Sequence, residues 1–199
     1  RFLLVRVKEK REAGALDVSV MASYFPPLSS REPVYRHRQV CKRLQAEMVR
    51  AGLGLPKRSA VVLGVDLNAR LGTFDPEMTD VSDDDVAEAK RYVGPVRPEQ
   101  ESYVGLMFRK VLKKLRLKAV NTFYDVGDTY SKGGERSARI DFLCLGVEEV
   151  VEDCRTLPRA QMKLQLSNRP VAMDHRPLMV TLLKVTEAEK MVMKEEQIQ

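Results

Sequence analysis

The sequence predicts a single α/β domain, in which strands and amphipathic helices alternate along the chain. Two apolar runs at residues 2–7 and 16–24 flank a charged turn, and the second run alternates apolar and polar residues as a half-buried strand does. Residues 30–51 place apolar side chains at near-helical spacing before Gly52, and a short loop leads to an apolar run at 61–68. A hairpin, a helix and another strand in this order are typical of an α/β layer.

Length and composition fit one globular domain with its own core. The chain has 199 residues, of which 44% are hydrophobic and 31% charged. No apolar run approaches the roughly 20 residues needed to cross a bilayer, so we expect no membrane partner. The net charge of +6 favours polyanionic partners, but 34 basic residues against 28 acidic ones are weak evidence for nucleic acid.

The three cysteines favour a reducing, intracellular compartment, without distinguishing nucleus from cytoplasm. Cys41, Cys144 and Cys154 are odd in number and scattered, and they form no Cys-x-x-Cys pair. Neither a disulfide framework nor a zinc knuckle is therefore supported. The sequence carries no indication of an oligomeric state.

The second half of the chain is predicted to continue the alternation after a long excursion at residues 71–100. The acidic run at 83–85 lacks the spacing of a calcium loop, so we interpret it as a solvated turn. His37 in the first helix, and the basic residues of the second, are most simply solvated faces. We expect a helix at 102–117, a strand at 119–123, a polar loop at 124–137, strands at 139–145, 147–151 and 177–183, and a charged tail at 185–199 after a domain at 1–184.

Asp66 and Asn68 end the strand predicted at 61–68. Two residues apart on an extended backbone, their side chains leave the same face. A carboxylate there can bind a divalent metal or hold a water, and the amide can bind an anionic substrate. Asp-x-Asn is also a common way to open the turn that ends a strand, and this stretch alone favours that simpler interpretation.

Other strand ends carry candidate groups as well. Asp141 is a charged residue inside an apolar strand, and its burial is expensive unless a cation, metal or imidazolium lies beside it. His175 can exchange a proton near neutral pH, and Asp174 projects to the other side of the extended chain. Tyr24 precedes two prolines, where its phenol either hydrogen-bonds a phosphate or only packs at the sheet rim. If these strands are neighbours, the groups can orient a histidine, hold a metal and align a water.

The sequence resembles the endonuclease/exonuclease/phosphatase superfamily. Four motifs occur in its order over most of the chain: residues 18–27 resemble "NVYAPP", 61–68 "GDFN", 139–143 "RIDYI" and 174–177 "SDHRP". Residues 68–72 and 120–123 further resemble retroelement-type members. The resemblance implies a four-layered α/β/β/α sandwich of two mixed sheets with outer helices, and hydrolysis of phosphate esters that depends on Mg²⁺ or Mn²⁺.

The resemblance also implies roles for individual residues. Asp66 would align or deprotonate the attacking water, while Asn68 would bind phosphate and hold that water. His175 would act at the scissile phosphate, with Asp141 orienting its imidazole. The remaining roles are a metal ligand for Asp174, a place near the phosphate or leaving group for Tyr24, and a supporting and substrate-binding loop residue for Thr129.

The departures from the family pattern concern the metal site. The family places a metal-binding Glu in an "LQE" strand ahead of the segment where this chain begins, and neither Glu12 nor Glu47 stands in that context. Met173 replaces the usual Ser before Asp-His, and Val65 is inserted before Asp66. We therefore expect an N-terminally truncated domain of a metal-dependent DNA endonuclease, with DNA favoured over RNA. The alternatives are a degenerate, non-catalytic domain that binds nucleic acid or protein, and a phosphatase acting on a small phosphorylated ligand.

Overall fold

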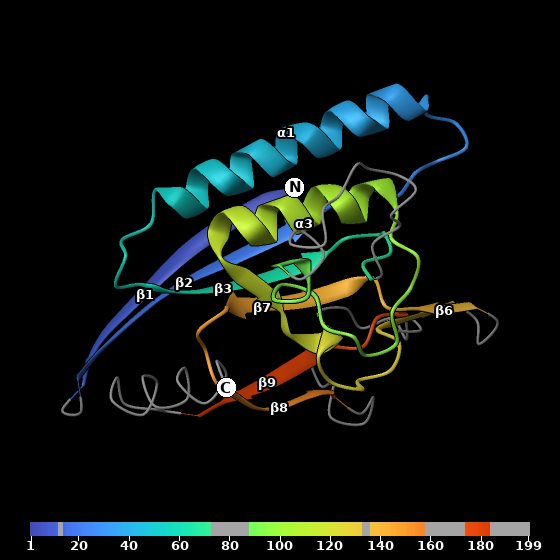
Figure 1. The fold of residues 1–199 in the computed structure, drawn as a ribbon. Coiled ribbons are helices and arrows are strands. Elements are labelled where there is room, and N and C mark those ends of the chain that lie inside the picture. Colours follow the sequence, from blue (N-terminus) through green and yellow to red (C-terminus); the bar gives the residue numbers. More distant parts are fainter. Residues whose placement is uncertain (12–13, 73–87, 133–135, 158–173, 184–199) are drawn as a thin grey trace, which may run out of the picture.

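A five-stranded mixed sheet is the centre of the computed structural model (Figure 1), which describes residues 1–11, 14–72, 88–132, 136–157 and 174–183. The predicted hairpin and the strand after the first helix are confirmed. Strands β2 and β3 run parallel, and every other pair in the sheet is antiparallel. In sheet order the strands are β1 (Phe2–Arg11), β2 (Gly14–Tyr24), β3 (Ala60–Asp66), β7 (Asp141–Gly146) and β4 (Leu117–Ala119).

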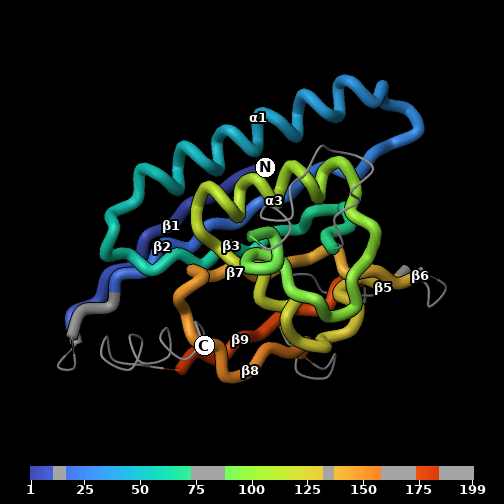
Figure 2. Tube along the Cα trace, viewed as in Figure 1, coloured from blue at the N-terminus to red at the C-terminus, as the bar shows by residue number. Residues whose placement is uncertain are grey.

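Two helices lie side by side over one face of this sheet (Figures 1 and 2). Helix α1 (Val34–Leu53) connects the parallel strands β2 and β3, as a crossover between parallel neighbours must. Helix α3 (Tyr103–Leu115) begins after Ser102, whose hydroxyl accepts a hydrogen bond from the Gly105 amide at 3.2 Å. Both helices were predicted, with ends shifted by a few residues. Within the described residues, no helix has the length and apolarity needed to span a membrane.

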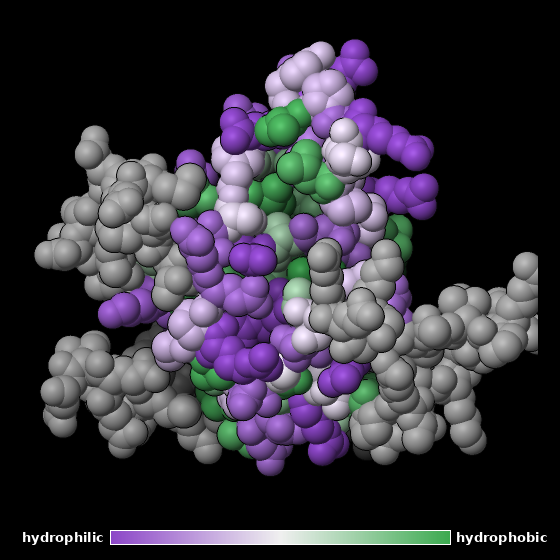
Figure 3. Space-filling model, turned by 90° about the vertical axis from the view of Figure 1, so that its right-hand side faces the viewer, coloured by the Kyte–Doolittle hydropathy of each residue, from purple (hydrophilic) through white to green (hydrophobic). Residues whose placement is uncertain are grey.

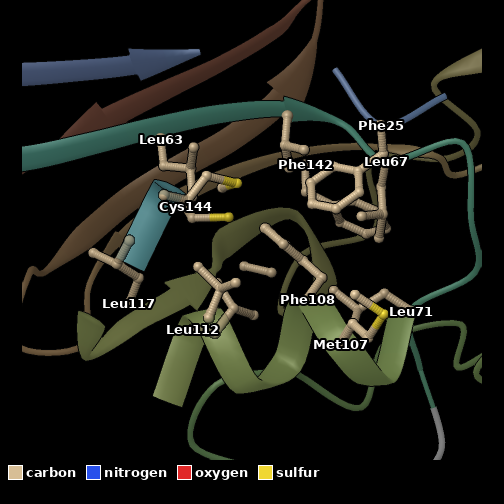
Figure 4. Packing of buried hydrophobic residues seen from close by; sticks show 14 of the residues in the cluster. Phe25, Leu63, Leu67, Leu71, Met107, Phe108, Leu112, Leu117, Phe142 and Cys144 are labelled. Atoms are coloured by element: carbon tan, nitrogen blue, oxygen red, sulfur yellow. The ribbon is translucent and has the colours of Figure 1, made fainter. Parts of the chain in front are cut away.

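The main core fills the space between the helices and the sheet (Figure 4). Phe108 of α3 meets Phe25 edge-on at a centroid distance of 6.2 Å and lies 6.4 Å from Phe142 of β7. Leu63 and Cys144, on β3 and β7, are fully buried on the same side. This packing fixes the two strands that carry the candidate carboxylates.

The opposite face of the sheet is partly covered by a second, two-stranded sheet. Strands β8 (Val151–Thr156) and β9 (Leu178–Leu182) pack through Cys154 and Val180 against Leu145 of β7. The described residues therefore form three layers, namely helices, a mixed sheet and a small sheet, and confirm the α/β class. The predicted four-layered sandwich has a last layer of helices that covers the outer face of its second sheet. The described residues contain no helix on the outer face of β8 and β9.

Two predictions for residues 119–137 are wrong. A strand was expected at residues 119–123, but a 3-10 turn, η2 (Val120–Thr122), follows β4, because the Thr122 hydroxyl donates to the Ala119 carbonyl at 2.6 Å. The polar loop at 124–137 contains a hairpin of β5 (Tyr130–Lys132) and β6 (Arg136–Ala138). The predicted acidic turn at 83–85 and tail at 185–199 lie outside the described residues.

His37 belongs to the buried face of α1, although a solvated position was predicted. Its Nε2 lies 2.8 Å from the Pro26 carbonyl oxygen, to which an Nε2–H donates, and 3.7 Å from Cys41 Sγ. The His37 side chain can be buried because these partners satisfy its hydrogen-bonding groups. Val34 and Val40 of the predicted apolar face are exposed instead. The buried face of α1 consists of His37, Cys41, Leu44 and Met48.

A buried ion pair attaches the end of the long excursion to α3. The Arg109 guanidinium donates to Glu101, with Nη2 2.9 Å from Oε1, and also donates to the Gly72 and Ala89 carbonyls. Both side chains are more than nine-tenths buried. Burial raises the pKa of Glu101, and the charge and hydrogen bonds of Arg109 only partly offset this effect. Arg109 thus connects both ends of the excursion, at residues 72 and 101, to one helix.

We expect the three cysteines to be unreactive in the folded protein. All are buried and free. Burial raises the pKa of Cys41 and Cys144, and burial together with Asp153 raises the pKa of Cys154 to about 11. The folded chain at pH 8 should therefore react slowly with an aromatic disulfide reagent, and the chain unfolded in guanidinium should release three equivalents at once. Rapid release of one equivalent from folded protein would contradict this packing.

Candidate active site

Three side chains from neighbouring strands form a row at one end of the five-stranded sheet. Tyr24, Asp66 and Asp141 are register partners across β2, β3 and β7. Residues directly opposite one another on adjacent strands project from the same face, so the row brings a phenol beside two carboxylates. It lies where β2 and β3 end and β7 begins. Figure 3 faces this side of the molecule, and its centre is hydrophilic.

His175 joins this row through Asp141. Its Nδ1 lies 3.0 Å from Asp141 Oδ2 and 3.2 Å from Oδ1. The Tyr130 ring meets the imidazole edge-on at a centroid distance of 5.0 Å, and the two residues form an isolated β-bridge. A carboxylate on Nδ1 fixes the orientation of the ring and directs Nε2 away from Asp141. Tyr130 is a contact that the sequence interpretation missed.

Asp66 and Asn68 form the turn that their spacing suggested, and their functional roles stay a prediction. The Asn68 amide N–H donates to Asp66 Oδ1 at 3.2 Å, and Asn68 has a φ of 48° in the left-handed region that asparagine tolerates. Its side-chain Nδ2 donates to the Phe25 carbonyl at 2.9 Å. Asn68 therefore also fixes the chain that follows Tyr24.

The position of Asp141 is maintained by two buried polar residues behind it. Thr129 is fully buried, and its Oγ1 accepts from the amides of Ile140 and Asp141 at 3.1 and 3.0 Å. Asn121 is also fully buried, donating to the Asp141 carbonyl at 2.9 Å and accepting from the Leu143 amide. Thr129 thus lies where it can support the site, and this burial leaves it no surface for the predicted substrate contact. Asn121 was missed as a supporting residue, although the motif at 120–123 contained it.

Replacing Thr129 by valine should lower the free energy of unfolding by about 1–3 kcal/mol. Valine has the shape of threonine but leaves the buried amides of Ile140 and Asp141 without an acceptor. Urea denaturation of the two proteins gives the difference. Thr129→Ser is the matched control, because it keeps the oxygen, and it should retain most of the stability. Equal stability of the valine variant would show that these hydrogen bonds do not hold Asp141.

The electrostatics of the row centre on Asp66. Burial raises the pKa of Asp66, and the nearby charge of Asp141 raises it further. His175 and the hydrogen bonds from Asn68 act in the opposite direction. A carboxyl with a raised pKa is a better proton acceptor when ionised, which suits a group that aligns or deprotonates water.

The described residues fit a divalent cation. Asp66, Asp141 and His175 each offer one ligand atom, and these atoms lie within 4.8 Å of one another. A cation beside Asp66 and Asp141 would relieve the repulsion that raises the pKa of Asp66. Mg²⁺ commonly takes one or two carboxylates and completes its shell with water and substrate phosphate. Asp174, the predicted metal ligand, is exposed and lies outside this group.

A groove of about 340 Å³ adjoins the row and is lined mainly by β3, β7 and the start of β9. Gly64 lies in its wall, and a Cβ added there would have no neighbour within 4 Å. Arg176 and Pro177, directly after His175, line the other side. The row is therefore accessible from one side of the sheet.

Comparisons with solved structures found a similar fold. An AP endonuclease from Archaeoglobus fulgidus matches with a TM-score of 0.50 and 18% identity, over 89% of this chain and 64% of that one. This chain has the fold of the endonuclease/exonuclease/phosphatase superfamily. Sequence searches gave no match to a protein-family model or to a curated protein.

Two further structures match this chain with lower TM-scores. The endonuclease domain of TRAS1, a telomere-specific non-LTR retrotransposon, has a TM-score of 0.47 and 19% identity over 92% of this chain. The 3' phosphatase NExo from Neisseria, bound to a product DNA hairpin, has a TM-score of 0.46 and 17% identity over 84% of this chain. The match covers 64% of the TRAS1 domain and 63% of NExo, so this chain spans less than two thirds of each of the three structures.

Proposed function

We propose that this chain is part of a phosphodiesterase that uses a divalent metal, Mg²⁺ or Mn²⁺, to hydrolyse nucleic acid, with DNA favoured over RNA. The observation that supports this most is the row of Tyr24, Asp66 and Asp141 with His175 hydrogen-bonded to Asp141. A phenol, two carboxylates and an imidazole at the accessible end of one sheet can hold a phosphate, align water and move a proton.

The residues of the row divide the reaction between them in this proposal. Asp66 accepts the proton of the attacking water, whose oxygen forms the new bond to phosphorus. His175, oriented by Asp141, donates a hydrogen bond or proton to the phosphate oxygens as the bond to the leaving alcohol breaks. Asn68 and Tyr24 contact the phosphate. A divalent metal would be held by the carboxylates that the row brings together, Asp66 and Asp141, with Asp174 as the further ligand that the family resemblance implies. It would supply positive charge for the phosphate as the phosphate gains negative charge.

The test is a plasmid-nicking assay with Mg²⁺, with Mn²⁺ and with EDTA. The 199-residue chain is compared with a longer form that adds the residues encoded upstream. Metal-dependent nicking that Asp66→Asn abolishes is the expected result. Nicking by neither form, or nicking that Asp66→Asn leaves unchanged, would refute the proposal. Inorganic phosphate release from a 3'-phosphorylated oligonucleotide, without nicking, would indicate a phosphatase.

A second candidate function is nucleic-acid binding without catalysis. The observation that favours it is that no glutamate among the described residues joins Asp66, Asp141 and His175 as a metal ligand. Salt-sensitive DNA binding without cleavage in both forms of the chain would support this function.

A further inference from the structure

The two helices over the sheet hold the excess positive charge of the chain. Helices α1 and α3 contain nine basic residues and one acidic residue, Glu47. The whole chain has 34 basic and 28 acidic residues, so the rest of it holds 25 basic and 27 acidic ones. The basic character of this protein is therefore a property of its helical layer.

Most of these cations face solvent without a carboxylate partner. Arg109 is buried against Glu101, and Lys113 pairs with Glu88. The other seven are exposed, and no described carboxylate forms an ion pair with any of them. Cations that lie close together on one layer repel each other, and binding of an anion relieves this repulsion. These seven are Arg36, Arg38, Lys42, Arg43, Arg50, Lys110 and Lys114.

Several exposed cations elsewhere in the described chain do have carboxylate partners. Arg91 and Arg116 share Glu148, at 3.4 and 2.9 Å. Likewise, Arg155 lies 3.5 Å from Asp153, and Arg58 lies 3.1 Å from Asp17. Such pairs stabilise the surface little, but they cancel its long-range field. The field of the helical layer is not cancelled in this way.

Contacts between α1 and α3 bring their cations onto one surface. The Arg38 guanidinium lies over the Tyr103 ring, 4.3 Å from its centroid. Further along, Gln45 donates to the Met107 carbonyl at 3.3 Å. The helices therefore lie side by side in the same direction (Figures 1 and 2).

The core-facing sides of both helices are apolar, so the cations lie on the outer side. Lys110 and Lys114 are one turn apart on α3, and Lys42 follows Arg38 by one turn on α1. All four side chains are exposed. We name Arg38, Lys42, Lys110 and Lys114 the helical cation surface.

We propose that the helical cation surface binds the phosphate backbone of nucleic acid, at a place separate from the catalytic row. The row lies at the end of β2 and β3, whereas this surface lies on the outer side of the helical layer. Several cations on one rigid surface match a polyanion of regularly spaced phosphates, and they gain affinity by releasing its counterions. The choice of nucleic acid as the polyanion rests on the proposed function, but the binding requires no catalysis.

An anionic membrane is the less suitable partner. A helix that lies on a bilayer inserts a continuous apolar face beneath its cations. The apolar face of α1, with Cys41, Leu44 and Met48, is already buried against the sheet. The apolar side chains that α1 does expose, Val34, Tyr35, Val40 and Leu53, are not spaced along one side of the helix, so they form no continuous face to insert.

The test measures binding of a fluorescent 30-base-pair duplex by anisotropy, in EDTA and over a range of salt concentrations. A variant with Arg38, Lys42, Lys110 and Lys114 all replaced by glutamine should bind at least about tenfold more weakly at low salt. Its slope of log affinity against log salt should fall by about 3 to 4, because each phosphate contact contributes about 0.9. The two double variants, one for each helix, should each lose about half of this slope, provided that thermal melting shows them folded.

The matched control removes the same charge from Arg58, Arg91, Arg116 and Arg155, which are four exposed cations that have carboxylate partners. This control should weaken binding less than threefold. An equal loss in both quadruple variants would refute the proposal, because net charge alone would then explain the binding. The proposal would also be refuted if the first variant lost binding to vesicles of phosphatidylserine and phosphatidylcholine while its binding to DNA stayed unchanged.

The Asp66→Asn variant separates this inference from the proposed function. It should lose cleavage and keep both its affinity for the duplex and the salt slope. A chain that cleaves nothing but binds through the helical cation surface would refute the proposed catalysis and support the surface. A chain that cleaves DNA with binding unaffected by the quadruple replacement would do the reverse.

Discussion

Replacing His175 by alanine should lower the rate of phosphodiester cleavage at least about 100-fold, the usual minimum for loss of a positioned acid–base group. The His175 side chain is 39% exposed and holds no core position, so the variant should fold. Its loss removes the group that Asp141 orients at 3.0 Å. Nicking rates at saturating metal, with circular dichroism as a check on folding, give the comparison.

Asp141→Asn provides a second measurement on the same pair. If Asp141 acts by orienting His175, the double variant His175→Ala/Asp141→Asn should be little slower than His175→Ala alone. Asp153→Asn removes a carboxylate of β8 outside the row and serves as the control, with an unchanged rate. A folded His175→Ala variant that cleaves at the rate of the unmodified protein would remove the histidine from the mechanism.

Replacing Glu101 by alanine should lower the free energy of unfolding by about 3–5 kcal/mol, because it leaves a charged guanidinium buried without its carboxylate. Arg109 is more than nine-tenths buried, and its Nη2 lies 2.9 Å from Glu101 Oε1. Urea denaturation at pH 7 measures the loss. The expected cost is large because Arg109 would lose the carboxylate that accepts from its Nε and Nη2.

Two further variants test whether the cost comes from loss of the Glu101 charge beside Arg109. Glu101→Gln keeps a hydrogen-bond acceptor and should be less destabilising than alanine. The double variant Glu101→Leu/Arg109→Met removes both charges and should recover much of the lost stability, since apolar side chains often replace buried pairs without loss. If the double variant is less stable than Glu101→Ala, the hydrogen bonds of the pair stabilise the fold beyond the cancellation of the two charges.

Periodicity predicted the elements that have a clear repeat. The hairpin β1–β2, helices α1 and α3, and strands β3, β7 and β9 all lie close to where apolar spacing placed them. It failed at η2 because Thr122 forms a side-chain hydrogen bond to the backbone, which apolar spacing does not report. It failed at His37 because a carbonyl from a preceding loop, that of Pro26, satisfies the imidazole.

The side chains of the candidate site were predicted together with one supporting residue, Thr129, whereas the supports Asn121 and Tyr130 were missed. Asp66, Asp141 and His175 were expected to lie together, and the structure brings them together. Asn121 and Tyr130 act through contacts with β7 and His175, and such contacts depend on which strands are neighbours. The catalytic and metal-binding roles of Asn68, Tyr24 and Asp174 stay predictions that the assays above address.

The residues of the row lie far apart in the sequence, which affects the refolding kinetics. Tyr24 and His175 are separated by 150 residues, and Asp66 and Asp141 come from strands between them. Contacts of such high sequence separation form only after large loops have closed, which makes them slow. Recovery of cleavage after dilution from denaturant should therefore follow the slowest folding phase, well after the helical circular dichroism signal has returned.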